Sequence, residues 1–197
     1  MLRRFLTVSL ALAALSSPAL AEDIAQNPGF ELRAGALFDY ASMHHDHDTF
    51  DHNYGLTDLG GFLSVGYRFQ SFGLYLDGTL THRERQKPGE NDHFFYFEDE
   101  LEGMAFDLML TGRFFVPINS DFAFVPNVGF GQSSDNVGGD KSFNIVYIQA
   151  QAGVGIDFKI TDRILLMGEI DYLFRTDVIF EDLGHALQAK LGLTYHF

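Results

Sequence analysis

The stretch FELRAGALFDY, residues 30–40, alternates between two kinds of side chain along its whole length. Its even-numbered residues are apolar or aromatic, whereas its odd-numbered residues include Glu31, Arg33 and Asp39. Successive side chains of a β-strand point to opposite faces of the sheet. The alternation therefore predicts a strand with one bulky apolar face and one polar, charged face.

The same alternation recurs along the rest of the chain. Seven further segments show it, and they are residues 59–69, 72–81, 106–116, 122–130, 148–158, 164–175 and 187–197. Together with the first segment they make eight strands, and no long helical pattern interrupts them. The sequence predicts an all-β protein.

The connections between these segments alternate in length. QS (70–71), PINSD (117–121) and KITD (159–162) are short turns, whereas the ranges 41–58, 83–103, 132–144 and 176–185 read as long polar loops. Short turns at one end and long loops at the other are typical of barrels in bacterial outer membranes. Aromatic residues also gather at the segment ends, where the interfacial girdles of such barrels lie. We therefore expect the bulky apolar face to point outward, toward lipid.

The last segment, LGLTYHF (191–197), places Leu193, Tyr195 and Phe197 on its apolar side. It resembles the closing-strand signal of outer-membrane barrels, and the whole pattern resembles the eight-stranded OmpA/OmpX-type barrels and related surface-antigen proteins. This resemblance implies an eight-stranded antiparallel up-and-down transmembrane β-barrel. It also implies recognition by the barrel-insertion machinery through these three residues, and both termini in the periplasm.

The N-terminal residues are typical of an export signal. Arg3 and Arg4 precede an apolar run, residues 5–15, and the small-residue pattern Ala19-Leu20-Ala21 follows it. The run is too short for a spanning helix, so a cleaved signal peptide is favoured over a membrane anchor. We predict a signal peptide at 1–21, a short periplasmic segment at 22–29 and the barrel at 30–197.

Composition excludes several classes of function. The chain has 13 Lys and Arg against 27 Asp and Glu, a formal net charge of −14, and no cysteine. An acidic surface repels nucleic-acid phosphates, so we expect no nucleic-acid partner. Disulfide and thiolate chemistry are absent. The expected partners are the lipid and lipopolysaccharide of the outer membrane, the insertion machinery, and an extracellular or envelope protein.

Closing the sheet would bring the polar faces of all the strands into one lumen. Eight strands leave an interior just wide enough to be filled by side chains, and buried charges must pair there. We expect an ion-pair network and not an open pore. Inward-facing glycines, namely Gly35, Gly66, Gly129, Gly153, Gly155 and Gly192, are expected to make room for the arginines. The charged residues expected in this network are Glu31, Arg33, Asp39, Arg68, Asp77, Asp107, Arg113, Asp157, Glu169, Asp171, Arg175 and Lys190.

The first long connection contains the stretch MHHDHDTFDHN (43–53), which is rich in histidine and aspartate. Imidazole nitrogens and carboxylate oxygens suit zinc, copper or nickel. No defined ligand spacing is present, so a solvated loop that binds metal weakly is the alternative to a specific site. The candidate ligands are His44, His45, Asp46, His47, Asp48, Asp51 and His52.

The second long connection, residues 83–103, is basic at its start and acidic at its end, with four aromatic residues between. It reads as an extended hairpin with its tip at 88–92, or as an exposed recognition surface. The acidic residues of these connections would repel lipopolysaccharide unless calcium or magnesium bridged them. No cofactor is required by any pattern in the chain, and a divalent cation (Zn, Ca or Mg) at the loops is the one ion that we expect.

No pattern in the chain indicates an enzyme. A Gly-x-Ser-x-Gly elbow is absent, and only the proximity of Ser42, His44 and Asp46 hints at a reactive group. We therefore expect a structural, adhesive or surface-interaction role for four extracellular loops on a plugged barrel. The alternatives are a narrow porin-like channel for ions or small solutes, and a metal-binding surface protein.

Overall fold

In the computed structural model, the described residues are 28–47, 50–85, 103–137, 143–177 and 182–197. Among these residues, no helix combines the length and the apolar character that crossing a membrane requires. The predicted signal peptide at 1–21, most of the segment at 22–29 and the hairpin tip at 88–92 lie outside them. The strands are β1 (Gly29–His47), β2 (Phe50–Arg68), β3 (Phe72–Arg85), β4 (Gly103–Phe114), β5 (Val116–Pro117), β6 (Phe122–Val137), β7 (Phe143–Lys159), β8 (Ile164–Asp177) and β9 (Asp182–His196).

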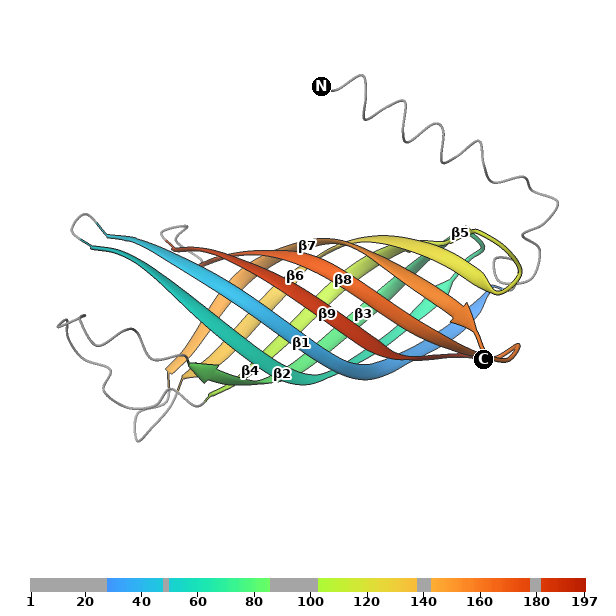
Figure 1. The fold of residues 1–197 in the computed structure, drawn as a ribbon, viewed down its shortest axis with the longest axis horizontal. Coiled ribbons are helices and arrows are strands. Elements are labelled where there is room, and N and C mark those ends of the chain that lie inside the picture. The colour runs from blue at the N-terminus through green and yellow to red at the C-terminus, as the bar shows by residue number, and fades with distance from the viewer. Residues whose placement is uncertain (1–27, 48–49, 86–102, 138–142, 178–181) are drawn as a thin grey trace, which may run out of the picture.

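The long strands form one closed antiparallel sheet (Figure 1). Their order is β4-β3-β2-β1-β9-β8-β7-β6, and β4 also pairs with β6, which closes the barrel. The first and last long strands pair with each other, with Glu31 opposite His196. β5 contains two residues and pairs with β6 alone. The predicted all-β, eight-stranded antiparallel barrel is therefore confirmed.

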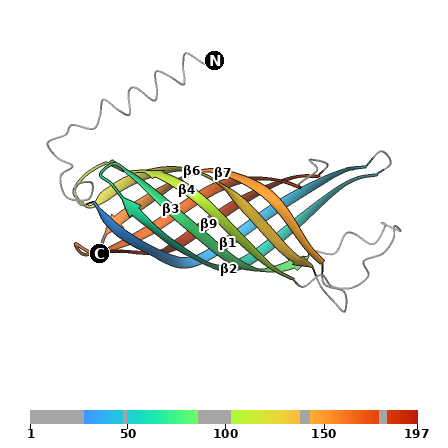
Figure 2. The same ribbon diagram turned by 180° about the vertical axis from the view of Figure 1, so that it is seen from behind.

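The two ends of the barrel differ. The start of β1, the end of β9 and the short connections at 69–71, 115–121 and 160–163 lie at one end, which we call the terminal end (Figures 1 and 2). Backbone hydrogen bonds close the short turns, including Phe69 N to Phe72 O at 2.8 Å and Ile160 N to Ile164 O at 2.9 Å. The opposite end, which we call the far end, carries the connections that the sequence predicts to be long.

The strands reach further toward the far end than the sequence predicts. The ranges 41–58, 132–144 and 176–185 are predicted as loops, but β1 continues to His47 and β2 begins at Phe50, while β6 ends at Val137 and β7 begins at Phe143. β8 likewise ends at Asp177 and β9 begins at Asp182. Polar residues end the apolar alternation here, but the backbone ladder continues because its hydrogen bonds do not depend on side-chain polarity.

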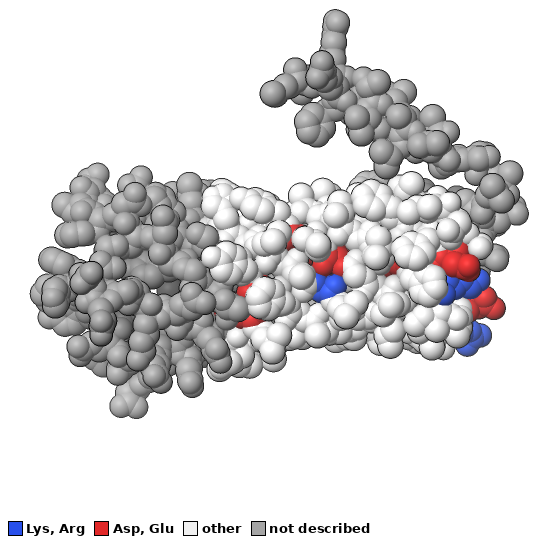
Figure 3. Space-filling view, viewed as in Figure 1, with Lys and Arg blue, Asp and Glu red and all other residues white. Residues whose placement is uncertain are grey.

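The outer surface of the barrel is apolar. Large hydrophobic side chains from every long strand are exposed on it. Figure 3 shows a mostly white wall, with charged atoms visible at the terminal end and between white side chains near the middle of the barrel. Near that end, neighbouring aromatic rings pack against one another, with centroids 5.1 Å apart for Phe30–Tyr67 and 4.9 Å for Tyr195–Phe197. This is the arrangement expected of an interfacial aromatic girdle.

Candidate functional site

The candidate site is the lumen, because the strand alternation brings every polar face to it. All twelve charged residues predicted to line the lumen are at most 5% exposed. They form three clusters along the barrel axis, which we call the terminal, central and far clusters. The terminal cluster contains Glu31, Arg33, Arg68 and Asp157; the central cluster contains Asp77, Arg113, Glu169, Asp171 and Lys190; the far cluster contains Asp39, Asp107 and Arg175.

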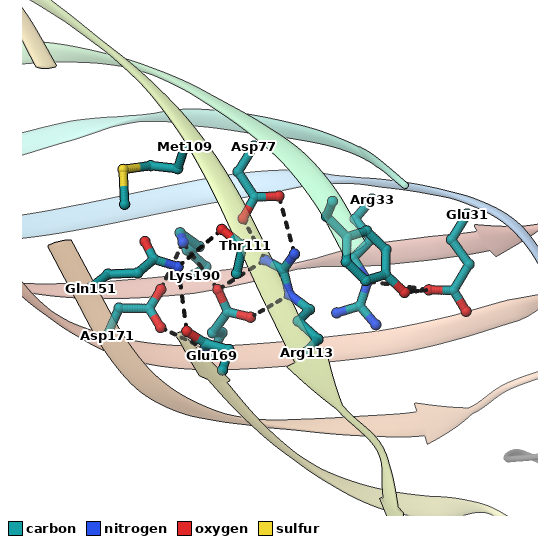
Figure 4. Close-up of polar contacts among 12 residues, drawn as sticks. Glu31, Arg33, Asp77, Met109, Thr111, Arg113, Gln151, Glu169, Asp171 and Lys190 are labelled. Carbon is teal, nitrogen blue, oxygen red and sulfur yellow. Dashed lines mark hydrogen bonds and ion pairs between the residues drawn. The ribbon is translucent and has the colours of Figure 1, made fainter. Parts of the chain in front are cut away.

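The central cluster joins opposite walls of the barrel (Figure 4). The Arg113 guanidinium on β4 donates to both oxygens of Asp77, at 3.1 and 2.8 Å, and to both oxygens of Glu169 on β8, at 3.1 and 3.3 Å. Lys190 Nζ lies 3.0 Å from Glu169 Oε1 and 2.7 Å from Asp171 Oδ2. Asn127 donates to the other Asp171 oxygen at 2.8 Å. Every carboxylate oxygen of this cluster therefore has a hydrogen-bond partner.

The terminal cluster combines ion pairs with aromatic rings. Arg33 on β1 contacts Asp157 on β7 at 2.7 Å, and Tyr75 donates to Glu31 at 2.6 Å. The Arg68 guanidinium carbon lies 3.9 Å from the ring centroid of Phe115. A guanidinium over an aromatic face at this distance is a stabilising cation–π contact. Phe115 is fully buried, so an aromatic side chain fills the lumen next to the short turns.

The far cluster is built around one arginine. Arg175 Nη2 on β8 lies 3.1 Å from Asp39 Oδ2 on β1 and 3.5 Å from Asp107 Oδ2 on β4. Arg175 Nε donates to Gln149 at 3.1 Å, and the Thr79 hydroxyl donates to Asp107 Oδ2 at 2.8 Å. Five strands thus converge on one guanidinium and its neighbours.

Apolar and aromatic side chains also fill the lumen. Leu37, Phe62 and Met167 form one buried group, and Tyr75 and Phe115 belong to another. Strand alternation was enough to place Leu37 and Phe62 on the inner face. Phe115 follows the outward-facing Phe114, and in the predicted segment 106–116 it has the same parity as the inward-facing Asp107 and Arg113.

The glycines on the inner face serve a purpose different from the one predicted. We expected them to make room for arginines, but no arginine atom is among the nearest atoms that an added Cβ would meet. At Gly66 a Cβ would meet the ring of Tyr75, and at Gly153 it would meet the carboxylate of Asp171. The nearest atoms belong mainly to residues of the neighbouring strands, and at Gly192 also to Phe62 on β2, so the nearest contacts do not support the expectation that these glycines accommodate arginines.

The predicted metal-binding residues lie at the far end, in strands and not in a loop. His44 to His47 belong to β1, and Asp51 and His52 belong to β2, with His45 opposite His52 and Asp46 opposite Asp51 in the backbone register. Asp48 lies outside the described residues. Among the side chains that the structure describes, no three His, Asp or Glu residues are grouped as a metal site.

The residues of the predicted insertion signal face outward. Leu193, Tyr195 and Phe197 are exposed on the last strand and its terminus. The Phe197 amide donates to the Phe30 carbonyl at 3.0 Å, which holds the chain end against the first strand.

Comparison with known proteins identifies related barrels. Residues 7–197 match the family model described as outer membrane protein beta-barrel domain. The chain is similar to the crystal structure of Neisserial surface protein A, with 14% identity and a TM-score of 0.60 over 87% of this chain and 100% of that one. It is also similar to the outer membrane protein OprG from Pseudomonas aeruginosa, with 14% identity and a TM-score of 0.53 over 86% of this chain and 96% of that one. No curated protein matches the chain. At these identities the likeness to solved structures shows the fold alone.

Proposed function

Because the chain belongs to the outer membrane protein beta-barrel domain family and is an outer-membrane barrel, we propose that its lumen is plugged and that its far end is the working surface. Both termini then lie in the periplasm, and the far end faces outward from the cell. The role is structural or adhesive, as the sequence predicts, and an extracellular or envelope protein is the partner.

The ion pairs that cross the lumen support the plug. Arg33 and Asp157 belong to β1 and β7, and Arg113 and Glu169 belong to β4 and β8. In neither pair are the two strands neighbours in the sheet, so each pair spans the interior and does not run along the wall. A conducting path would have to separate buried opposite charges, and removing one member of such a pair costs about 3–5 kcal/mol.

Planar-bilayer recording tests the plug. The refolded protein should give no steady single-channel steps, while flotation with the same lipid vesicles shows that it has inserted. Steady steps of uniform size would contradict the plug and support the narrow channel that is the alternative function.

The extended strands at the far end support a surface role. β1 and β2 pair as far as His47 and Phe50, so a hairpin continues well past the last lumen cluster. Rigid scaffolds that carry exposed connections are common sites of binding. Capture from intact cell envelopes tests this role with two baits, the full chain and a variant in which a two-residue Asn-Gly turn replaces 44–53. We expect the full chain to capture a partner that the variant does not. If both baits captured the same amount of partner, the hairpin would be excluded as the binding surface.

The register of the same hairpin favours metal binding as a second candidate function. Positions 45, 47 and 52 share one face because His45 is opposite His52 and strand alternation adds His47. Residues opposite each other have Cβ atoms about 4.5–5.5 Å apart, and three imidazoles are a known zinc ligand set. Positions 44, 46 and 51 share the other face.

Calorimetric titration with zinc tests this candidate. The protein should bind zinc saturably, and replacing His45, His47 and His52 with alanine should abolish the heat. His44→Ala is the matched control, since it removes a histidine from the opposite face and should leave binding intact. Equal loss in both variants would indicate weak, unspecific binding.

A further inference from the structure

The far cluster has two carboxylates for one guanidinium, and its polar groups are incompletely paired. Asp39 and Asp107 are at most 3% exposed, and both touch Arg175 through their Oδ2 atoms. Their Oδ1 atoms are buried and have no hydrogen-bond partner among the residues that the structure describes. A buried carboxylate oxygen without a partner is strongly penalised.

Two more unpaired groups lie on the neighbouring strands. Ser133 on β6 is directly opposite Asp107 in the sheet, and Gln188 on β9 is directly opposite Asp39. Both side chains are buried in the lumen, and within the described part of the chain Ser133 Oγ and Gln188 Nε2 have no hydrogen-bond partner. Residues opposite each other in adjacent strands present their side chains to the same space. Four buried polar atoms without a partner among the described residues therefore belong to the two carboxylates that contact Arg175 and to the residues opposite them in the sheet.

Charge balance alone does not identify this site. The central cluster has three carboxylates and two cationic groups, yet each of its carboxylate oxygens has a partner. In the far cluster, by contrast, Asp39 and Asp107 outnumber their shared arginine and each also has an oxygen without a partner among the described residues. Asp58, another buried carboxylate, is opposite Asp39 and has interactions of its own.

We propose that Asp39 Oδ1, Asp107 Oδ1 and Ser133 Oγ bind a monovalent alkali cation, Na⁺ or K⁺, inside the barrel. Hard cations take carboxylate, hydroxyl and water oxygens as ligands. Asp39, Asp107 and Arg175 together carry one net negative charge, which one monovalent cation neutralises. The Gln188 amide donates to a water that completes the coordination. Water alone would satisfy the hydrogen bonds but would leave the buried charge uncompensated.

Diffraction from crystals of the full chain soaked in rubidium chloride tests the proposal directly. Data collected at the rubidium absorption edge should show an anomalous peak in the lumen between Asp39 and Asp107. Density for water there, without an anomalous peak, would overturn the proposal.

Thermal unfolding of the refolded protein in detergent micelles gives a second readout. At equal ionic strength, KCl should raise Tm over choline chloride by about 2–4 °C, because a ligand of the folded state stabilises it. Asp107→Asn should abolish the response. Ser133→Ala keeps both carboxylates and therefore the fold. It should raise the half-saturating K⁺ concentration about fivefold, because one of the three protein oxygens that bind the ion is lost, a loss comparable with that of one polar contact.

Asp157→Asn is the matched control. It also removes a buried lumen carboxylate, but at the terminal end of the barrel, and the K⁺ response should persist. The proposed cation site would be wrong if the unmodified chain showed no K⁺ response. It would also be wrong if Asp107→Asn, Ser133→Ala and Asp157→Asn weakened the response equally.

Discussion

Arg113 is the residue on which the central cluster depends, because it is bonded to two carboxylates from different strands. Replacing it with methionine should lower the free energy of unfolding by about 3–5 kcal/mol, since Asp77 and Glu169 would remain buried without their shared cation. Urea unfolding in lipid vesicles measures the change. Arg163→Met, in an exposed turn, should change the free energy by less than about 0.5 kcal/mol. Similar effects of the two variants would show that the ion pairs contribute little.

Gly153 is required by its cross-strand neighbour. A Cβ there would meet the Asp171 carboxylate and lie 2.6 Å from the Ile170 carbonyl oxygen, and backbone cannot move aside cheaply. Gly153→Ala should therefore destabilise the barrel by about 1–3 kcal/mol. Gly78→Ala is the control, because the nearest atom that its Cβ would meet, the Leu63 carbonyl oxygen, is 3.7 Å away. Equal unfolding midpoints for the two variants would contradict this reading of the inner face.

Strand alternation predicts which residues face the lumen but not which of them pair. Each charged residue's face follows from its parity within one strand. Arg33 and Asp157, in contrast, are 124 residues apart in sequence, and their contact depends on barrel closure and on the register of several strands. The inward turn of Phe115 agrees with its parity in the alternating segment 106–116, but its contact with Arg68 likewise depends on barrel closure.

At the scale of elements, β9 has two separable roles, closing the sheet and carrying the proposed insertion signal. Phe197 is 69% exposed, so its ring contributes little packing to the folded barrel. Phe197→Ala should strongly reduce the amount of folded protein in the outer-membrane fraction of cells. The same variant refolded in detergent should unfold within about 0.5 kcal/mol of the unmodified chain.

Phe30→Ala is the matched control for that experiment. Phe30 is an outward-facing ring of similar exposure at the same end of the barrel, but it lies on β1. Its replacement should leave the amount in the outer membrane unchanged. If both variants reduced the amount of folded protein in the outer-membrane fraction equally, the aromatic girdle as a whole, and not the end of the chain, would control assembly.

The existence and order of the strands could be predicted, whereas their far ends could not. Alternation of apolar and polar residues is visible only where one face meets an apolar environment. Beyond Tyr40 the sequence becomes polar on both faces, so β1 loses its pattern there while its backbone pairing with β2 continues to His47. The metal-binding candidates therefore lie in a paired hairpin, where register groups them in a way that a loop would not.

At the scale of the whole molecule, the barrel has charged side chains in its interior and apolar side chains on its outer surface, which is the reverse of a soluble protein. Because the outer surface faces lipid, the loss of stability caused by a charged residue there depends on how deep in the bilayer the residue lies. Strand residues rise about 3.3 Å along strands tilted about 35–45°. Leu76, four residues from the aromatic girdle at Phe72, therefore lies about 10 Å into an apolar band about 25 Å tall.

Leu76→Arg should consequently destabilise the barrel in lipid vesicles by about 2–4 kcal/mol, the cost of a cation near the middle of the bilayer. Ile118→Arg should cost about 0–1 kcal/mol. Both side chains are exposed, at 52% and 63%, so water around the barrel would give two small and similar effects. Unfolding free energies in vesicles distinguish these outcomes. A deep arginine tolerated as well as the one in the turn would mean that the apolar wall does not face hydrocarbon.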